Sequence, residues 1–120
     1  MGLPRERRLR QRRRFEEVYR RGRTWTNRWL VLKALPSPEA SSRIGIAAGK
    51  ALGSAVLRHK LQRRLREVLR QQTLPPGWDI VIIARPPLVE ASFAQVTDAM
   101  NDILGRAHLL PNTIKLGTDD

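Results

Sequence analysis

Residues 49–70 restrict the fold more than any other segment, because they predict a tight turn that leads into one long helix with two unlike sides. Ser54 suits the position before its first turn, since a serine hydroxyl there accepts a hydrogen bond from a free backbone amide. No glycine or proline then follows until Pro75. At about 100° per residue, one side of the helix is aliphatic and is expected to be buried. That side consists of Leu57, Leu61, Leu65, Val68 and Leu69.

The opposite side of this helix is almost entirely basic. Like charges three or four positions apart repel each other by a few tenths of a kcal/mol per pair, and a bound polyanion relieves that repulsion. Solvated helix faces normally mix both signs, whereas only Glu67 interrupts this one. The pattern therefore favours a nucleic-acid contact over a merely solvated surface. The face holds His59, Lys60, Arg63, Arg66 and Arg70, with Arg58 and Arg64 at its borders.

Charge and length narrow the class of protein further. The net charge of +12, from 23 Lys and Arg against 11 Asp and Glu, predicts attraction to polyanions whatever the fold. The 120 residues suit one domain with a modest core. Cysteine is absent, so a disulfide framework and a thiolate metal site are excluded.

No run approaches the ~18 apolar residues of a membrane span, and the first residues lack the apolar region of a secretory signal. We expect a cytoplasmic protein with no membrane contact.

The order of predicted elements is helix, strand, strand, helix, strand, helix, which indicates a mixed α+β domain. A short amphipathic helix is expected over 12–21, with Gly22 as its stop. Strands are expected over 25–35, as one strand or split in two, and over 43–48. The Pro- and Ser-rich loop between them favours a hairpin. Residues 79–84 contain a continuous β-branched run, which predicts a strand buried on both faces.

The last helix is expected to be scaffold. Ser92 and Gln95 form a capping-box pattern at its start, and its outer side is only mildly polar. Its apolar stripe consists of Phe93, Val96, Met100, Ile103, Leu104 and Ala107.

Residues 1–110 are predicted to form a single RNA-binding domain with a basic, flexible arm over about 1–11 that orders on a polyanion. Residues 111–120 are predicted to be a flexible, mostly polar tail.

Two further features allow more than one interpretation. Phe15 and Tyr19 stand four residues apart on the first predicted helix, where they could be core or, among neighbouring arginines, a stacking surface for unpaired bases. Gly45 and Ala47 give one face of the second strand little bulk, which predicts the floor of a shallow groove.

No catalytic constellation is recognisable in the sequence. His59 and His108 lie far apart, and the carboxylates are too scattered for a two-metal site. There is no phosphate-binding glycine loop ending in Lys and Ser or Thr, and no nucleophile motif. The protein alone is expected to be catalytically inert, with no small-molecule substrate and no cofactor or metal of its own.

Residues 50–67 resemble the signature of the bacterial ribonuclease P protein subunit, a Gly-Asn-Ala-Val-x-Arg-Asn-Arg block embedded in basic residues. The matching residues are Lys50, Gly53, Ala55, Val56, Arg58, Arg63, Arg66 and Glu67. The departures are Ser54, His59, Lys60 and Gln62. The first helix of the family is matched by Leu9, Phe15, Val18, Tyr19 and Gly22. The resemblance extends over residues 9–110.

The resemblance implies an α/β sandwich in which the crossover between residues 43–48 and 80–84 is left-handed. It also implies an endoribonuclease ribonucleoprotein whose RNA subunit carries the catalytic centre and uses Mg²⁺. The protein would bind that RNA and the 5′ leader of precursor tRNA, and so promote leader removal. The residues implied for the catalytic RNA are Lys50, Arg58, His59, Lys60, Arg63, Arg64 and Arg66. Those implied for the leader are Phe15, Tyr19, Val31, Lys33 and Ala47.

Two alternatives remain at this point. A ribosomal or RNA-chaperone-type protein would share the charge but would not distinguish RNAs by a leader. A basic module for acidic membranes or acidic proteins would prefer anionic vesicles to a structured RNA, although the basic helix lacks the aromatic residues typical of a membrane interface. A DNA-binding helix-turn-helix is disfavoured because strands, not a partner helix, flank the basic helix.

Overall fold

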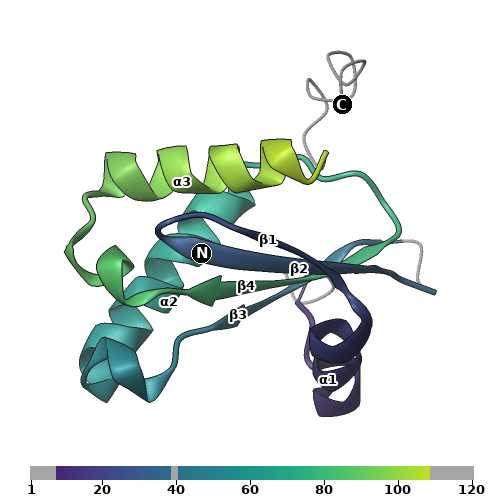
Figure 1. Cartoon of the computed structure of the whole chain (residues 1–120), viewed down its shortest axis with the longest axis horizontal. Coiled ribbons are helices and arrows are strands. Elements are labelled where there is room, and N and C mark those ends of the chain that lie inside the picture. The colour runs from purple at the N-terminus through teal and green to yellow at the C-terminus, as the bar shows by residue number, and fades with distance from the viewer. Residues whose placement is uncertain (1–7, 39–40, 109–120) are drawn as a thin grey trace.

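The computed structural model describes residues 8–38 and 41–108, and these form a mixed α+β domain (Figure 1). The predicted order of elements is confirmed, with the first strand split in two around residues 27–29. Short 3-10 turns at Lys50–Leu52 and Pro86–Glu90 complete the described chain. The helices and strands are α1 (Arg12–Arg21), β1 (Arg23–Thr26), β2 (Leu30–Pro36), β3 (Arg43–Ala47), α2 (Ala55–Arg70), β4 (Trp78–Ala84) and α3 (Phe93–Arg106).

The strand order of the sheet, β1-β2-β4-β3, corrects one prediction. The expected hairpin between residues 25–35 and 43–48 is wrong, because β4 lies between β2 and β3, antiparallel to β2 and parallel to β3. The hairpin is formed by β1 and β2 instead. The continuous apolar run of β4 explains this order, since a strand that is apolar on both faces is best buried in the interior of a sheet.

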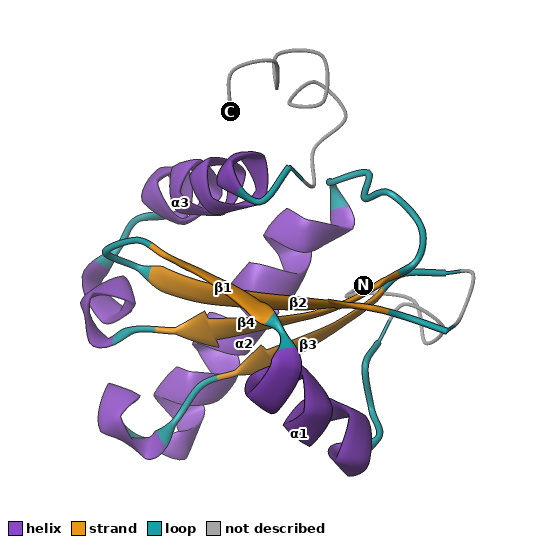
Figure 2. Cartoon of the chain, turned by 45° about the vertical axis from the view of Figure 1, so that its right-hand side comes forward, coloured by secondary structure: helices purple, strands orange, loops and turns teal. Residues whose placement is uncertain are grey.

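Helices cover both faces of this sheet, which makes two unequal apolar layers (Figure 2). The larger core lies between the sheet and the pair α2 and α3. It includes Leu32 and Ile82 from the sheet and Leu65 and Met100 from the helices. On the other face α1 covers a small cluster around Val18, Val81 and Leu9. That face is therefore only partly covered, and its remaining strand residues stay near solvent.

Helix α1 ends at Gly22, as predicted, but for a different reason from the one expected. A glycine stop often adopts the left-handed conformation, whereas Gly22 is extended, with φ −72° and ψ 152°. A Cβ at this position would lie 2.5 Å from the Val18 carbonyl oxygen and 3.1 Å from that of Ala34. Glycine is needed because the chain passes so close to its own helix and to β2.

Helix α2 follows its predicted pattern closely. The Ser54 hydroxyl accepts a hydrogen bond of 3.2 Å from the Leu57 amide, and the aliphatic side faces the main core. Leu57 is half-buried, while the rest of that side is fully buried. The buried members are Leu61, Leu65, Val68 and Leu69.

Helix α3 confirms the capping box of Ser92 and Gln95 but corrects one member of the apolar stripe. Val96, Met100 and the following apolar positions are buried, whereas Phe93 is 46% exposed. Phe93 is the first residue of the helix, where Ala91 and Val96 already close the core.

The described part of the predicted arm, residues 8–11, lies against the sheet. The Leu9 amide donates a 2.8 Å hydrogen bond to the Ile44 carbonyl, and Leu9 is buried. This short stretch extends the sheet beyond β3. The rest of the arm and the predicted tail lie outside the described residues. Within the described ranges, no helix combines the length and apolar character needed to cross a bilayer.

Candidate nucleic-acid interface

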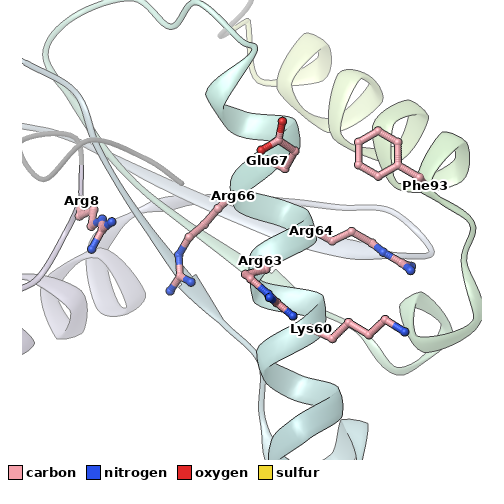
Figure 3. Close-up of a pocket in the computed structure, with 7 residues that line it drawn as sticks. All are labelled: Arg8, Lys60, Arg63, Arg64, Arg66, Glu67 and Phe93. Carbon is pink, nitrogen blue, oxygen red and sulfur yellow. The ribbon is translucent and has the colours of Figure 1, made fainter. Parts of the chain in front are cut away.

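The basic side of α2 is exposed and carries unpaired positive charge (Figure 3). His59, Lys60 and Arg63 are exposed, and Arg66 is half-buried. Across residues 8–38 and 41–108, no carboxylate forms an ion pair with Lys60, Arg63 or Arg66. These cations are therefore available to a bound polyanion.

Three other members of the predicted RNA-binding set are positioned differently. Arg64 is half-buried and donates a 3.1 Å hydrogen bond to the Ala91 carbonyl, so it also links α2 to the start of α3. Arg58 is half-buried, and its Nε is buried without a hydrogen-bond partner in the described structure. Lys50 is exposed on the 3-10 turn that precedes α2. The set therefore lies on α2 and the adjoining turn, with Arg58 and Arg64 partly embedded in the scaffold.

The acid on the basic side, Glu67, is neutralised by a neighbour on its own helix. Arg70 Nη2 lies 2.6 Å from a Glu67 carboxylate oxygen, and this hydrogen bond lowers the pKa of Glu67 below its ordinary value. The Glu67 charge is thus engaged toward the end of α2, which leaves the field of Lys60 and Arg63 largely intact.

The two aromatic residues of α1 are in contact with each other. The ring centroids of Phe15 and Tyr19 lie 6.5 Å apart in an edge-to-face arrangement of 75°, and Tyr19 is 44% exposed. The Phe15 ring rests on the backbone of β3, where a Cβ on Gly45 would come within 2.2 Å of its Cζ. Gly45 is consequently buried, so the predicted groove floor is not open at this position.

The remaining predicted leader residues lie on the same face of the sheet as α1. Val31 and Ala47 pair with opposite sides of Ile83, so the three form one row of half-buried apolar side chains across β2, β4 and β3. The Lys33 Nζ donates a 2.9 Å hydrogen bond to Thr24 Oγ1 in the neighbouring row. Sequence reasoning missed Ile83, because its place in the row depends on β4 being an inner strand.

A hollow of about 260 Å³ joins the two predicted residue sets at the outer edge of β3. Phe15 of the leader set and Arg66 of the catalytic-RNA set both line it, whereas Val31, Lys33 and Ala47 do not. Arg8 also lines this hollow, and in Figure 3 Arg8 lies across from Arg66 of α2. The two predicted surfaces are therefore contiguous. The full lining is Arg8, Leu9, Arg10, Phe15, Ile44, Gly45, Ile46 and Arg66.

A buried ion cluster that sequence reasoning missed fixes α1 to the sheet. Asp79 on β4 is fully buried. It accepts a 2.5 Å hydrogen bond from Arg14 Nε and two of 2.9 Å from Arg43 on β3. Arg14 also bonds Glu17 and the Pro36 carbonyl. Because Arg14 immediately precedes Phe15, this cluster sets where the aromatic pair sits.

The Asp79 carboxyl is kept ionised in spite of its burial. Desolvation alone would raise its pKa, but the hydrogen bonds from Arg43 and Arg14 outweigh that effect and hold the pKa below its ordinary value. The cluster therefore links α1, β3 and β4 through hydrogen bonds between charged groups.

Among residues 8–38 and 41–108, no three His, Asp or Glu side chains gather closely enough to hold a metal ion. The arrangement as it stands can bind phosphates through α2 and stack bases near α1.

Comparisons with known proteins identify relatives of this chain in sequence and in fold. The family profile for Ribonuclease P matches residues 3–108. The ribonuclease P protein component of Roseiflexus castenholzii is 39% identical over 110 residues, which cover 89% of this chain and 90% of that protein. The solved Staphylococcus aureus RNase P protein superposes with a TM-score of 0.79 at 28% identity, covering 87% of this chain and 97% of that one. The Thermotoga maritima RNase P protein gives a TM-score of 0.76 at 32% identity, with 82% and 96% covered.

Proposed function

The chain belongs to the ribonuclease P protein family, and on that premise we propose that it binds the ribonuclease P RNA through α2 and the 5′ leader of precursor tRNA beside α1. Membership in the family makes it the protein component of a ribonuclease that acts in tRNA processing. The further proposal concerns which surface meets which RNA.

One observation carries the assignment of the catalytic RNA to α2. Lys60, Arg63 and Arg66 are adjacent on one helix, and within the described structure they form no ion pair. Guanidinium groups bind phosphate in a bidentate manner, and phosphate contacts supply most of the affinity for a folded RNA with little reading of sequence.

The leader assignment is supported by the other face of the sheet. Tyr19 offers an exposed ring, and the row of Val31, Ile83 and Ala47 beside α1 offers a flat apolar surface. Unpaired bases stack on such surfaces with little sequence preference. The hollow shared by Phe15 and Arg66 would let a strand pass from one surface to the other.

In this proposal the protein supplies binding and positioning, and the RNA subunit supplies the chemistry with Mg²⁺. The basic side of α2 would also offset phosphate repulsion when the substrate meets the RNA subunit, which lowers the amount of Mg²⁺ needed for assembly.

Reconstitution tests the proposal directly. The purified protein is mixed with a ribonuclease P RNA and precursor tRNA at a Mg²⁺ concentration where the RNA alone is nearly inactive, and 5′ processing is measured. We expect processing only when protein and RNA are both present. Equal processing with and without the protein, or preferential binding to anionic vesicles over the RNA, would contradict it.

The affinity for ribonuclease P RNA is expected to fall steeply with salt. If about five phosphates are neutralised, the slope of log K against log salt should be roughly −3.5 to −4.5. Fluorescence titrations from about 0.05 to 0.2 M monovalent salt measure this slope. A flat response in that range would show that the basic side of α2 is not the binding surface.

Removing the exposed ring of Tyr19 is expected to affect leader recognition selectively. Tyr19→Ala should weaken binding of leader-bearing precursor tRNA to the holoenzyme by about tenfold, because the loss of one stacked base costs about that much affinity. Mature tRNA should bind as before. Tyr19→Phe keeps the ring and is the matched control, expected to behave as the unaltered protein. An equal loss for both tRNAs would argue against a leader site beside α1.

A further inference from the structure

The Phe93 ring is exposed at the start of α3, where the core is already closed without it. It is 46% exposed at the first position of α3, while Ala91 and Val96 are buried at 4% and 0%. A residue just before the N-cap and one four positions after it form the hydrophobic staple that fixes a helix start. Ala91 and Val96 hold these positions, so Phe93 is not needed to anchor the helix.

Basic side chains from α2 line one pocket together with this ring. A pocket of about 550 Å³ is lined by Phe93 together with Arg8, Lys60, Arg63, Arg64, Arg66 and Glu67. Figure 3 shows Lys60 and Arg64 extending from α2 toward the side where α3 begins, with the Phe93 ring near Arg64. The single acid, Glu67, is engaged by Arg70 at 2.6 Å, so the pocket is strongly positive.

Arg64 is held in place at this pocket. Its Nη1 donates to the Ala91 carbonyl at 3.1 Å, two residues before Phe93, and the side chain is half-buried. A guanidinium has five donor hydrogens in a fixed plane, so this bond leaves others available. Preorganising one cation next to an aromatic ring lowers the entropy cost of binding a ligand there.

We propose that this pocket binds one unpaired nucleotide of the RNA held by α2, with its base stacked on Phe93 and its phosphate contacted by Lys60 and Arg64. The inference rests on the proposed function, because it adds a base contact to the phosphate contacts of the same helix. A duplex presents its phosphates but not a free base face, so the ring would gain nothing from paired RNA. An unpaired nucleotide uses both the ring and the cations.

A photo-crosslink locates the nucleotide. The full chain is made with p-benzoylphenylalanine in place of Phe93 and is bound to a ribonuclease P RNA transcript, with and without leader-bearing precursor tRNA. Primer extension then maps the crosslinked positions. We expect one dominant crosslink, to a nucleotide of the ribonuclease P RNA that is unpaired in its secondary structure. Crosslinks that spread over paired regions, or that fall mainly on the leader or on a protein, would overturn the assignment.

Affinity measurements separate stacking from packing. Phe93→Leu keeps apolar bulk but removes the ring, and it should weaken RNA binding by about tenfold with no change in the salt slope. Phe93→Tyr should retain the affinity. Lys60→Gln should instead make the slope shallower by about 0.7 to 0.9. Equal affinity of Phe93→Leu and the unaltered protein would refute this pocket alone, whereas failure of the unaltered protein to bind the RNA would refute the proposed function.

Discussion

Replacing Asp79 by alanine is expected to lower the free energy of unfolding by roughly 3–5 kcal/mol, as removal of one partner from a buried ion cluster does. Asp79 is fully buried, and the side chains of Arg14 and Arg43 are only 13% and 19% exposed. Without the carboxylate, both guanidinium groups stay near the interior with fewer acceptors. Urea denaturation at neutral pH measures the loss.

The matched control breaks an ion pair at the surface. Arg70→Ala removes the partner of Glu67, and both side chains are substantially exposed, at 45% and 36%. Exposed pairs contribute about 0 to 1 kcal/mol, so this variant should be nearly as stable as the unaltered protein. Similar losses in the two variants would show that the Asp79 cluster is no more important than a surface pair.

The effect of Asp79 should also depend on pH in a defined direction. Its pKa is lowered in the folded state, so its stabilisation is complete above the unfolded value of about 3.9 and disappears as the pH falls through the lower, folded value. The stability difference between the unaltered protein and Asp79→Asn should therefore be constant from about pH 7 to 5 and shrink below about pH 4. Glu67 lies outside this cluster, so its titration is the same in both proteins and cancels. A difference that stays constant down to about pH 3 would exclude the charge as its source.

Patterns that repeat along one helix were the most predictable part of this fold. The bounds of α1 and α2 follow from the spacing of apolar residues and from caps such as Ser54, and both ends of α1 agree with the structure. The basic side of α2 was predictable for the same reason, because 3.6-residue periodicity places side chains on a face without knowledge of the rest of the chain.

Contacts between distant segments were less predictable. Sequence neighbours suggested that residues 25–35 and 43–48 pair, but β4 separates them, because burial of a strand on both faces outweighs the short connection. Asp79 looked like one more strand residue, since nothing in a sequence shows that Arg14 and Arg43 converge on it. Phe93 fitted the apolar stripe of α3 but is exposed. The helical periodicity of a sequence cannot show where the apolar core beneath the helix ends.

Neutralising two cations on the basic side of α2 is expected to weaken binding of ribonuclease P RNA on the order of 100-fold. Lys60 and Arg63 are exposed and form no ion pair within the described ranges. Each charge-assisted hydrogen bond to phosphate contributes about 1.5–3 kcal/mol, and 1.4 kcal/mol corresponds to about tenfold in affinity. The variant Lys60→Gln/Arg63→Gln should also flatten the salt slope by about 1.4 to 1.8.

The matched control removes the same charge from cations that are already paired. Arg12 lies 3.5 Å from Glu16 on α1 and Arg106 lies 3.7 Å from Asp102 on α3, so Arg12→Gln/Arg106→Gln lowers the net charge equally but spares the unpaired cations of α2. The affinity of this control variant for ribonuclease P RNA should fall by no more than a few-fold, because it loses only long-range electrostatic attraction. If the two double variants lost affinity to the same extent, binding would depend on total charge rather than on the arrangement of α2. The ribosomal or RNA-chaperone type of contact would then describe this surface better than docking on a folded RNA subunit.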